Sequence, residues 1–190
     1  MSDFFALINR MRYIKRWSLM RNNVPENLME HSFQVAVIAQ ALALIKNKKF
    51  GASVDVDKVV SVALFHDAGE VFTGDMPTPI KYNNPKIKEA YKDIEAQAEK
   101  RIVSMLPEEF RPYYKPLISP DGDSEEYRIV KRADKLSAYI KCLEETASGN
   151  AEFSLAGQST KAALEKEDSP EVKYFIDKFL QSFFKPLDAL

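Results

Sequence analysis

Helical hydrophobic periodicity runs through almost the whole chain, and no segment shows the alternating apolar and polar pattern of a β-strand. The clearest stripe consists of His31, Val35, Ile38, Leu42 and Ile45, which marks the buried face of one long helix. No repeat, low-complexity tract or shift in composition divides the 190 residues. We therefore expect one all-α domain, residues 1–190, built as a bundle of roughly six to eight helices.

Capping residues set the expected helix boundaries. Ser, Asn and Asp side chains accept hydrogen bonds from the free amides of a first helical turn, and Pro is tolerated at the first helical position. The sequence predicts helices from Ser2 or Asp3 to about Ile14, from the capping-box pair Asn27 and Glu30 onward, from Asp55 or Asp57 to near Gly69, from Asn84 to about Leu106, over a short piece at 107–114, from the capping-box spacing of Asp123 and Glu126 to Gly149, over 151–166, and from Ser169 to Pro186.

Charge and apolar patterning argue against several classes of protein. The 27 basic and 28 acidic side chains leave a net charge of −1, which is a poor match to a nucleic acid polymer. The longest near-continuous apolar run, residues 35–45, is interrupted by Gln40 and falls short of the roughly 20 residues that span a membrane, so no membrane helix is expected. Cys142 is the only cysteine, so no internal disulfide forms. This fits a cytoplasmic protein in which Cys142 is a packed small hydrophobe.

Two histidines and two aspartates fall on or beside the apolar faces of three separate helices: His31, the adjacent pair His66 and Asp67, and the distant Asp134. Buried imidazoles and carboxylates need partners, and one divalent metal ion would satisfy all four groups together. Mixed nitrogen and oxygen ligands suit Mn, Fe, Co, Ni or Zn better than Ca. The alternative is a set of separate core histidines and ion pairs.

The ordered set of these four residues resembles the H…HD…D signature of the HD-domain metallohydrolases. The flanking segments are similar to those of the bacterial 5′-deoxynucleotidases of that superfamily, the YfbR-like enzymes. The resemblance implies an all-α homodimer that removes phosphate from deoxyribonucleoside 5′-monophosphates with a divalent metal such as cobalt or manganese. It is carried by the segments IKRWSLMRN, ENLMEHSFQVA, HDAGEVFTGDMPTPIKY and VKRADKLSAYIKCLEE.

The resemblance also implies roles for individual residues. The metal ligands would be His31, His66, Asp67 and Asp134. The catalytic glutamate would be Glu70. The substrate contacts would be Arg16, Trp17, Asp67, Asp75, Met76, Pro77, Thr78 and Asp134.

The residues expected to contact substrate have suitable chemistry of their own. Arg16 lies in the stretch 4–25, which contains no acidic residue, and its guanidinium can grip a phosphate while Trp17 packs on the sugar or base. A solvated basic face and a core or interface indole are the alternatives. Asp75 is either an acceptor for a sugar hydroxyl or a turn residue after Gly74.

Glu70 follows His66 by four residues and Asp67 by three. If the helix continues that far, Glu70 shares their face and can act as a general acid or base. The alternative is an ordinary exposed glutamate at a helix end.

Together these features predict a metal-dependent phosphomonoesterase acting on deoxynucleoside 5′-monophosphates. In this interpretation the ion activates a water and polarises the phosphoryl group, Glu70 assists proton transfer, and Arg16 neutralises the phosphate. Two alternatives stay open. One is an HD-type phosphohydrolase or phosphodiesterase acting on another nucleotide, and the other is a non-catalytic nucleotide-binding regulatory module.

Overall fold

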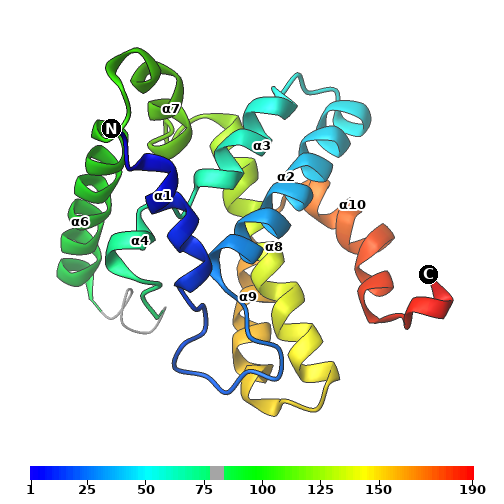
Figure 1. Cartoon of the computed structure of the whole chain (residues 1–190). Coiled ribbons are helices and arrows are strands. Elements are labelled where there is room, and N and C mark those ends of the chain that lie inside the picture. The colour runs from blue at the N-terminus through cyan, green and yellow to red at the C-terminus, as the bar shows by residue number, and fades with distance from the viewer. Residues whose placement is uncertain (78–83) are drawn as a thin grey trace.

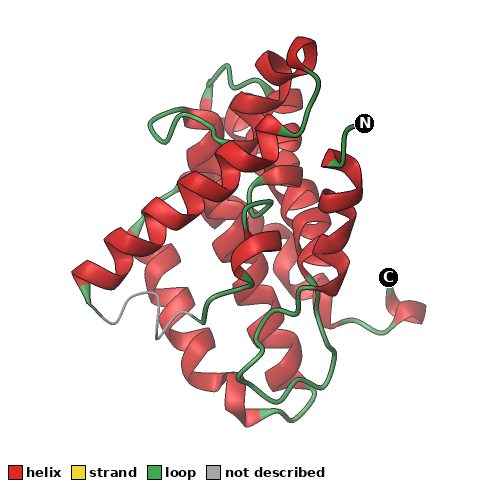
Figure 2. Cartoon of the chain, turned by 60° about the vertical axis from the view of Figure 1, so that its left-hand side comes forward, coloured by secondary structure: helices red, strands yellow, loops and turns green. Residues whose placement is uncertain are grey.

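The structure, a computed structural model, describes residues 1–77 and 84–190. The regular elements in these two ranges are helices, apart from one antiparallel bridge between Lys15 and Asn27, and Figure 2 draws them without a strand. The predicted all-α class is confirmed. The elements, labelled where there is room in Figure 1, are α1 (Phe4–Ile8), η1 (Asn9–Tyr13), α2 (Leu28–Phe50), α3 (Val56–Phe65), α4 (Glu70–Thr73), α6 (Pro85–Ser104), η2 (Glu108–Phe110), α7 (Arg111–Ile118), α8 (Glu125–Ala147), η3 (Ala151–Phe153), α9 (Ser154–Lys166), α10 (Pro170–Phe179), η4 (Leu180–Phe184) and η5 (Leu187–Ala189).

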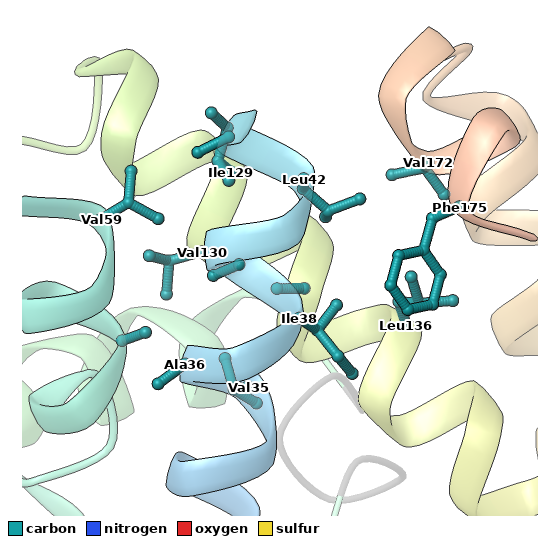
Figure 3. Close-up of a cluster of buried hydrophobic side chains, with 14 of the residues drawn as sticks. Val35, Ala36, Ile38, Leu42, Val59, Ile129, Val130, Leu136, Val172 and Phe175 are labelled. Atoms are coloured by element: carbon teal, nitrogen blue, oxygen red, sulfur yellow. The ribbon is translucent and has the colours of Figure 1, made fainter. Parts of the chain in front are cut away.

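Helix α2 lies at the centre of the larger hydrophobic core and packs against α3, α8 and α10. By length and hydropathy alone this helix could cross a membrane, although the sequence predicted no membrane helix. More than half of its most apolar window is buried inside the protein, so we interpret it as a core helix. Figure 3 shows the packing of Val35, Ala36, Ile38 and Leu42 of α2 with Val59 of α3, Ile129, Val130 and Leu136 of α8, and Val172 and Phe175 of α10.

A second hydrophobic cluster forms beside the first. Phe4 of α1 meets Ile102 of α6, Ile118 of α7 and Ala68, which lies in the turn between α3 and α4. All four of these residues are almost completely buried. The cluster thereby packs the turn that carries His66 and Asp67 against the N-terminal helix and the α6–α7 pair.

Three of the predicted helix caps are present. The Asn27 side chain accepts hydrogen bonds from the amides of Met29 and Glu30, both at 3.0 Å, while the Glu30 carboxylate accepts from the Asn27 amide at 3.1 Å. This confirms the capping box. Asp55 caps α3, and Asn84 caps α6 with Pro85 at the first helical position.

Several predicted boundaries are wrong. The piece expected at 107–114 continues to Ile118, and the last α-helix ends at Phe179 and continues as the 3₁₀-helix η4 instead of reaching Pro186. Helix α8 begins after Ser124, whose hydroxyl accepts from the Tyr127 amide at 3.3 Å, so the first turn is capped without Asp123. Helix α3 ends at Phe65 rather than near Gly69, and residues 66–69 form a turn. His66 Nδ1 donates a hydrogen bond to the Ala63 carbonyl at 2.7 Å. In a continuing helix that carbonyl would accept from the Asp67 amide instead.

Replacing Asn27 with alanine is expected to lower the free energy of unfolding by about 1 kcal/mol, because two amides at the start of the central helix lose their acceptor. Urea denaturation followed by circular dichroism measures this change. Gln40→Ala is the matched control, since Gln40 is exposed in the middle of the same helix. Equal stability of the two variants would show that the capping box contributes nothing.

Helices α8 and α9 approach closely where Gly157 lies against Cys142. A methyl group added at Gly157 would stand 3.3 Å from the Cys142 Cβ, tighter than ordinary van der Waals contact. Cys142 is free and fully buried, and burial raises the pKa of its thiol to about 11. The prediction that Cys142 is a packed small hydrophobe is confirmed.

Candidate metal centre and nucleotide pocket

Three of the four predicted metal ligands converge from different parts of the fold. His31 of α2, His66 of the turn after α3 and Asp134 of α8 each offer a ligand atom, and these atoms all lie within 4.8 Å of one another. His31 Nε2 is 3.1 Å from an Asp134 carboxylate oxygen. Both imidazole side chains are completely buried. The side chains of these residues, separated by up to about a hundred positions in the chain, can therefore share one cation.

Asp67, the fourth predicted ligand, borders this group. Its Oδ2 atom is 3.1 Å from His66 Nε2 and 3.7 Å from His31 Nε2. The carboxylate therefore faces the same two imidazole nitrogens that face Asp134. Its carboxylate borders the three convergent ligand atoms without belonging to that group, so its role as a fourth ligand stays a prediction.

The hydrogen bonds behind the two rings fix which nitrogen faces the cluster. His66 donates from Nδ1 to the Ala63 carbonyl, so its Nε2 carries a lone pair, and this buried atom has no hydrogen-bond partner among the described residues. The Ser137 hydroxyl donates to Gln34 at 2.6 Å, so it can only accept from His31 Nδ1 at 3.3 Å. Both rings thus turn Nε2 toward carboxylates, an arrangement that a metal cation satisfies.

The charges in the cluster favour a divalent cation. Burial raises the pKa of Asp67 and Asp134, but nearby cationic groups reverse the direction. The His66 imidazole holds the pKa of Asp67 well below its usual range, and the Lys131 ammonium, 3.0 Å from Asp134, does the same there. Two ionised carboxylates therefore stand beside two imidazole rings, and this mixed set of oxygen and nitrogen donors matches a transition metal.

Arg16 lies between this cluster and open solvent. Its side chain is 12% exposed, with Nη1 3.6 Å from Asp67 Oδ2 and Nε 3.3 Å from the Glu26 carboxylate. The pKa of Arg16 is raised: burial opposes this, but Asp134 and Asp67 outweigh it. The interpretation of Arg16 as part of a solvated basic face is therefore wrong.

Trp17 adopts an uncommon backbone conformation for a bulky residue. Its φ angle is +56°, in the left-handed region. Its amide donates to Asp75 Oδ2 at 3.2 Å, its carbonyl accepts from Asn22 at 3.2 Å, and its ring lies 5.3 Å from the Phe153 ring. Strain of this kind persists where neighbouring groups hold it in place, which is common at functional sites. Asp75 therefore anchors the Trp17 backbone, a role that was not anticipated.

A cavity of about 620 Å³ opens beside Arg16 and Trp17. Asp75, Met76 and Pro77, which are predicted to contact substrate, line it, and Thr78 lies outside the described residues. The far wall comes from η3 and α9 and was not predicted. It consists of Glu152, Leu155, Ala156, Ser159 and Thr160.

Glu70 begins helix α4 instead of continuing the helix of His66, so the predicted shared helical face is wrong. Its amide donates to the Asp67 carbonyl at 3.0 Å, which keeps it one turn away from that carboxylate. Glu70 is only 8% exposed, so it is not an ordinary surface glutamate. His66 and Asp67 in the turn after α3 and Glu70 at the start of α4 thus lie close together along the chain.

The sequence did not single out several polar residues that contact the predicted ones. Lys131 binds Asp134, Ser137 binds His31, and Glu26 binds Arg16. Lys131 and Ser137 lie three residues before and after Asp134, on the same helical face, and this spacing was the available signal. Glu26 is the first acid after the acid-free stretch 4–25.

Comparison with protein families matches residues 3–183 to the model "5′-deoxynucleotidase YfbR-like". A 5′-deoxynucleotidase of Vibrio parahaemolyticus, VP0926, is 50% identical over 190 residues, covering 100% of this chain and 98% of the relative. The 5′-deoxynucleotidase YfbR of Escherichia coli is also 50% identical, covering 100% of this chain and 96% of its own. The resemblance found in the sequence motifs is confirmed.

Solved structures share the fold. An HD-domain phosphohydrolase of Listeria innocua superposes with a TM-score of 0.83 at 26% identity, covering 97% of this chain and 90% of the other. The HD phosphohydrolase DatZ of cyanophage S-2L, solved with dA and one catalytic Zn²⁺ ion, gives a TM-score of 0.68 at 20% identity, covering 93% and 96%. The helical arrangement is therefore that of the HD-domain proteins.

Proposed function

Because the chain belongs to the YfbR-like 5′-deoxynucleotidase family, we propose that it is a metal-dependent enzyme that hydrolyses deoxyribonucleoside 5′-monophosphates to the deoxynucleoside and phosphate. The observation that supports this most strongly is the position of Arg16. Its guanidinium lies 3.6 Å from Asp67 at the edge of the histidine and aspartate cluster, and it also lines the 620 Å³ cavity. A phosphate held by Arg16 is thereby placed next to the metal ligands, with the nucleoside directed into the cavity.

His31, His66, Asp67 and Asp134 are the residues that would hold the divalent ion, and two Nε2 atoms that face the cluster, together with two ionised carboxylates, fit one. A bound divalent ion supplies Lewis acidity, lowering the pKa of water and polarising the phosphoryl group. Arg16 then neutralises and orients the phosphate. Trp17 and the α9 wall enclose the nucleoside, and Glu70 moves a proton as the bond between phosphorus and the 5′-oxygen breaks.

A phosphate-release assay tests this proposal against its alternatives. Deoxynucleoside and ribonucleoside 5′-monophosphates, di- and triphosphates and a phosphodiester are offered to the metal-loaded protein. Release of phosphate from deoxynucleoside monophosphates above all others is the expected result. Preference for a di- or triphosphate or a diester would favour another HD-type activity, and binding without turnover would favour a regulatory module.

The finer properties of the enzyme also follow the family resemblance. We propose cobalt or manganese as the activating ion, because mixed nitrogen and oxygen donors suit such metals. We further propose that the chain acts as one domain, that it forms a homodimer and that it works in the cytoplasm, where a free buried cysteine such as Cys142 is stable. Metal reconstitution followed by light scattering tests the ion and the oligomeric state.

Arg16→Ala is expected to keep the metal while raising KM for deoxynucleoside monophosphates about 100-fold or more, because a charge-assisted phosphate contact is lost. Arg16→Lys should recover only part of this, since an ammonium cannot reproduce the planar fork that a guanidinium offers. Steady-state kinetics and elemental analysis measure the two effects separately. An unchanged KM and kcat in Arg16→Ala would remove Arg16 from substrate binding.

A further inference from the structure

The Glu26 carboxylate touches both the phosphate-binding and the metal-binding sides of the site. Its Oε2 atom accepts hydrogen bonds from Arg16 Nε at 3.3 Å and from Trp17 Nε1 at 3.1 Å. Its Oε1 atom is 3.7 Å from His31 Nδ1, on the side of the ring that faces away from the cluster. One side chain therefore joins two substrate residues to a metal ligand.

The backbone holds Glu26 firmly in this place. The Arg16 amide donates to the Glu26 carbonyl at 3.0 Å, and the Leu28 amide donates to the Ile14 carbonyl at 2.9 Å. These bonds flank the antiparallel bridge between Lys15 and Asn27, so the loop between them closes on itself. The Glu26 side chain points inward and is 13% exposed.

The contacts of Glu26 restrict the Arg16 guanidinium. With Nε held by Glu26 and Nη1 beside Asp67, the plane of the group is fixed at two points. The N–H groups that Glu26 does not engage stay available to a phosphate. The same carboxylate fixes the indole of Trp17, which otherwise depends on its contact with Phe153.

Because Glu26 is negatively charged, its side chain cannot itself attract a phosphate substrate. A carboxylate that is hydrogen-bonded to the phosphate-binding guanidinium repels a phosphate dianion and weakens the attraction of Arg16 for it. Any benefit from Glu26 must therefore come from orientation. The two effects have opposite signs, because removing a repulsion tightens substrate binding whereas removing an orienting contact weakens it.

We propose that Glu26 is a positioning residue, which orients Arg16 and Trp17 toward the nucleotide and holds His31 with Nε2 toward the metal. This inference rests on the proposed function for its kinetic test. The structural part of the inference stands on contacts within the protein. Trp17 is the only tryptophan of the chain, so its fluorescence reports the contact directly without any turnover.

The experiment compares Glu26→Ala and Glu26→Gln with wild type, using deoxyadenosine 5′-monophosphate as substrate. In Glu26→Ala, KM should rise about tenfold to a hundredfold, as expected for the loss of hydrogen bonds to a charged group, with a smaller fall in kcat. Trp17 emission and its quenching by acrylamide should change at the same time. Glu26→Gln keeps one oxygen acceptor, so its emission should match wild type and its KM should lie within a few-fold. Glu108→Ala, which removes an exposed acid, is the matched control.

Several results would overturn the proposal. A lower KM in both Glu26 variants would show that Glu26 acts only by repulsion, and unchanged KM and emission in Glu26→Ala would show that it orients nothing. If Glu26→Ala does not fold, Glu26→Gln decides alone. A raised KM and a changed Trp17 emission in Glu26→Gln would then contradict the proposal, because this variant keeps one oxygen acceptor. If the wild-type protein releases no phosphate, the proposed function fails, while the emission of Trp17 still decides whether Glu26 holds the indole.

Discussion

Replacing His66 or Asp134 with alanine will abolish stoichiometric binding of a divalent metal and, with it, release of phosphate from deoxynucleoside monophosphates. Each substitution removes one member of a cluster whose ligand atoms lie within 4.8 Å of one another. The three or fewer donors that remain bind the ion so weakly that dialysis removes it. We expect kcat to fall by about 1,000-fold or more, because the Lewis acid contributes several kcal/mol to the barrier reduction. Elemental analysis and a phosphate-release assay on the same samples measure both losses.

Asp57→Ala is the matched control, because Asp57 is an exposed aspartate on helix α3. That variant should keep its metal and its activity. Chelation of the wild-type protein should likewise abolish activity and lower Tm, and re-addition of the metal should restore both, since an ion bound only by the folded state stabilises it. Full metal occupancy in both ligand variants would contradict the proposed centre.

Replacing Glu70 with alanine or glutamine will leave the metal content and KM close to wild type and lower kcat by a factor of about 100 to 10,000, the usual range for a general acid or base. Glu70 is almost completely buried, and its amide donates to the Asp67 carbonyl. It therefore follows two predicted metal ligands closely in the chain, but its carboxylate is not one of the convergent ligands. Steady-state kinetics with elemental analysis separate the loss of kcat from any loss of metal.

The glutamine variant decides the role of Glu70. An amide keeps the size and hydrogen-bonding shape of the side chain but cannot transfer a proton at neutral pH. A near-native kcat in Glu70→Gln would therefore show that Glu70 only orients a group or supports the turn. Glu89→Gln, an exposed change on helix α6, is the control and should behave as wild type.

The predictable part of the fold depends on local chemistry. The Asn27 capping box and the buried stripe of the central helix are contacts between residues three or four apart, so the sequence displays them directly. The end of α3 at Phe65 was missed because the deciding bond joins a side chain, His66 Nδ1, to the Ala63 carbonyl. The cap of α8 was misplaced by one residue because Ser124 and Asp123 are both good capping residues, and the local turn selects between them.

In the candidate site, too, some residues could be predicted from the sequence and others are identified only by the folded structure. The four expected ligands carry unusual chemistry for buried helical faces, which is why the sequence alone singled them out. The α9 wall of the cavity carries no such signal, since Leu155 and Ala156 are ordinary helix residues. Leu155 is 77% exposed, and only the folded chain shows that it faces a cavity. Glu26 was missed for a related reason, because a carboxylate beside a phosphate site opposes the expected charge.

The close contact between Gly157 and Cys142 makes the dimensions of the cavity depend on residues that do not line it. Helix α9 forms the far wall, and it lies close to α8 where Gly157 meets the Cys142 side chain. A methyl group at residue 157 would require Cys142 or α9 to give way by a few tenths of an ångström, because protein interiors are close-packed. The width of the cavity is thus adjustable from the back of the helix, at residues that no molecule inside the cavity touches.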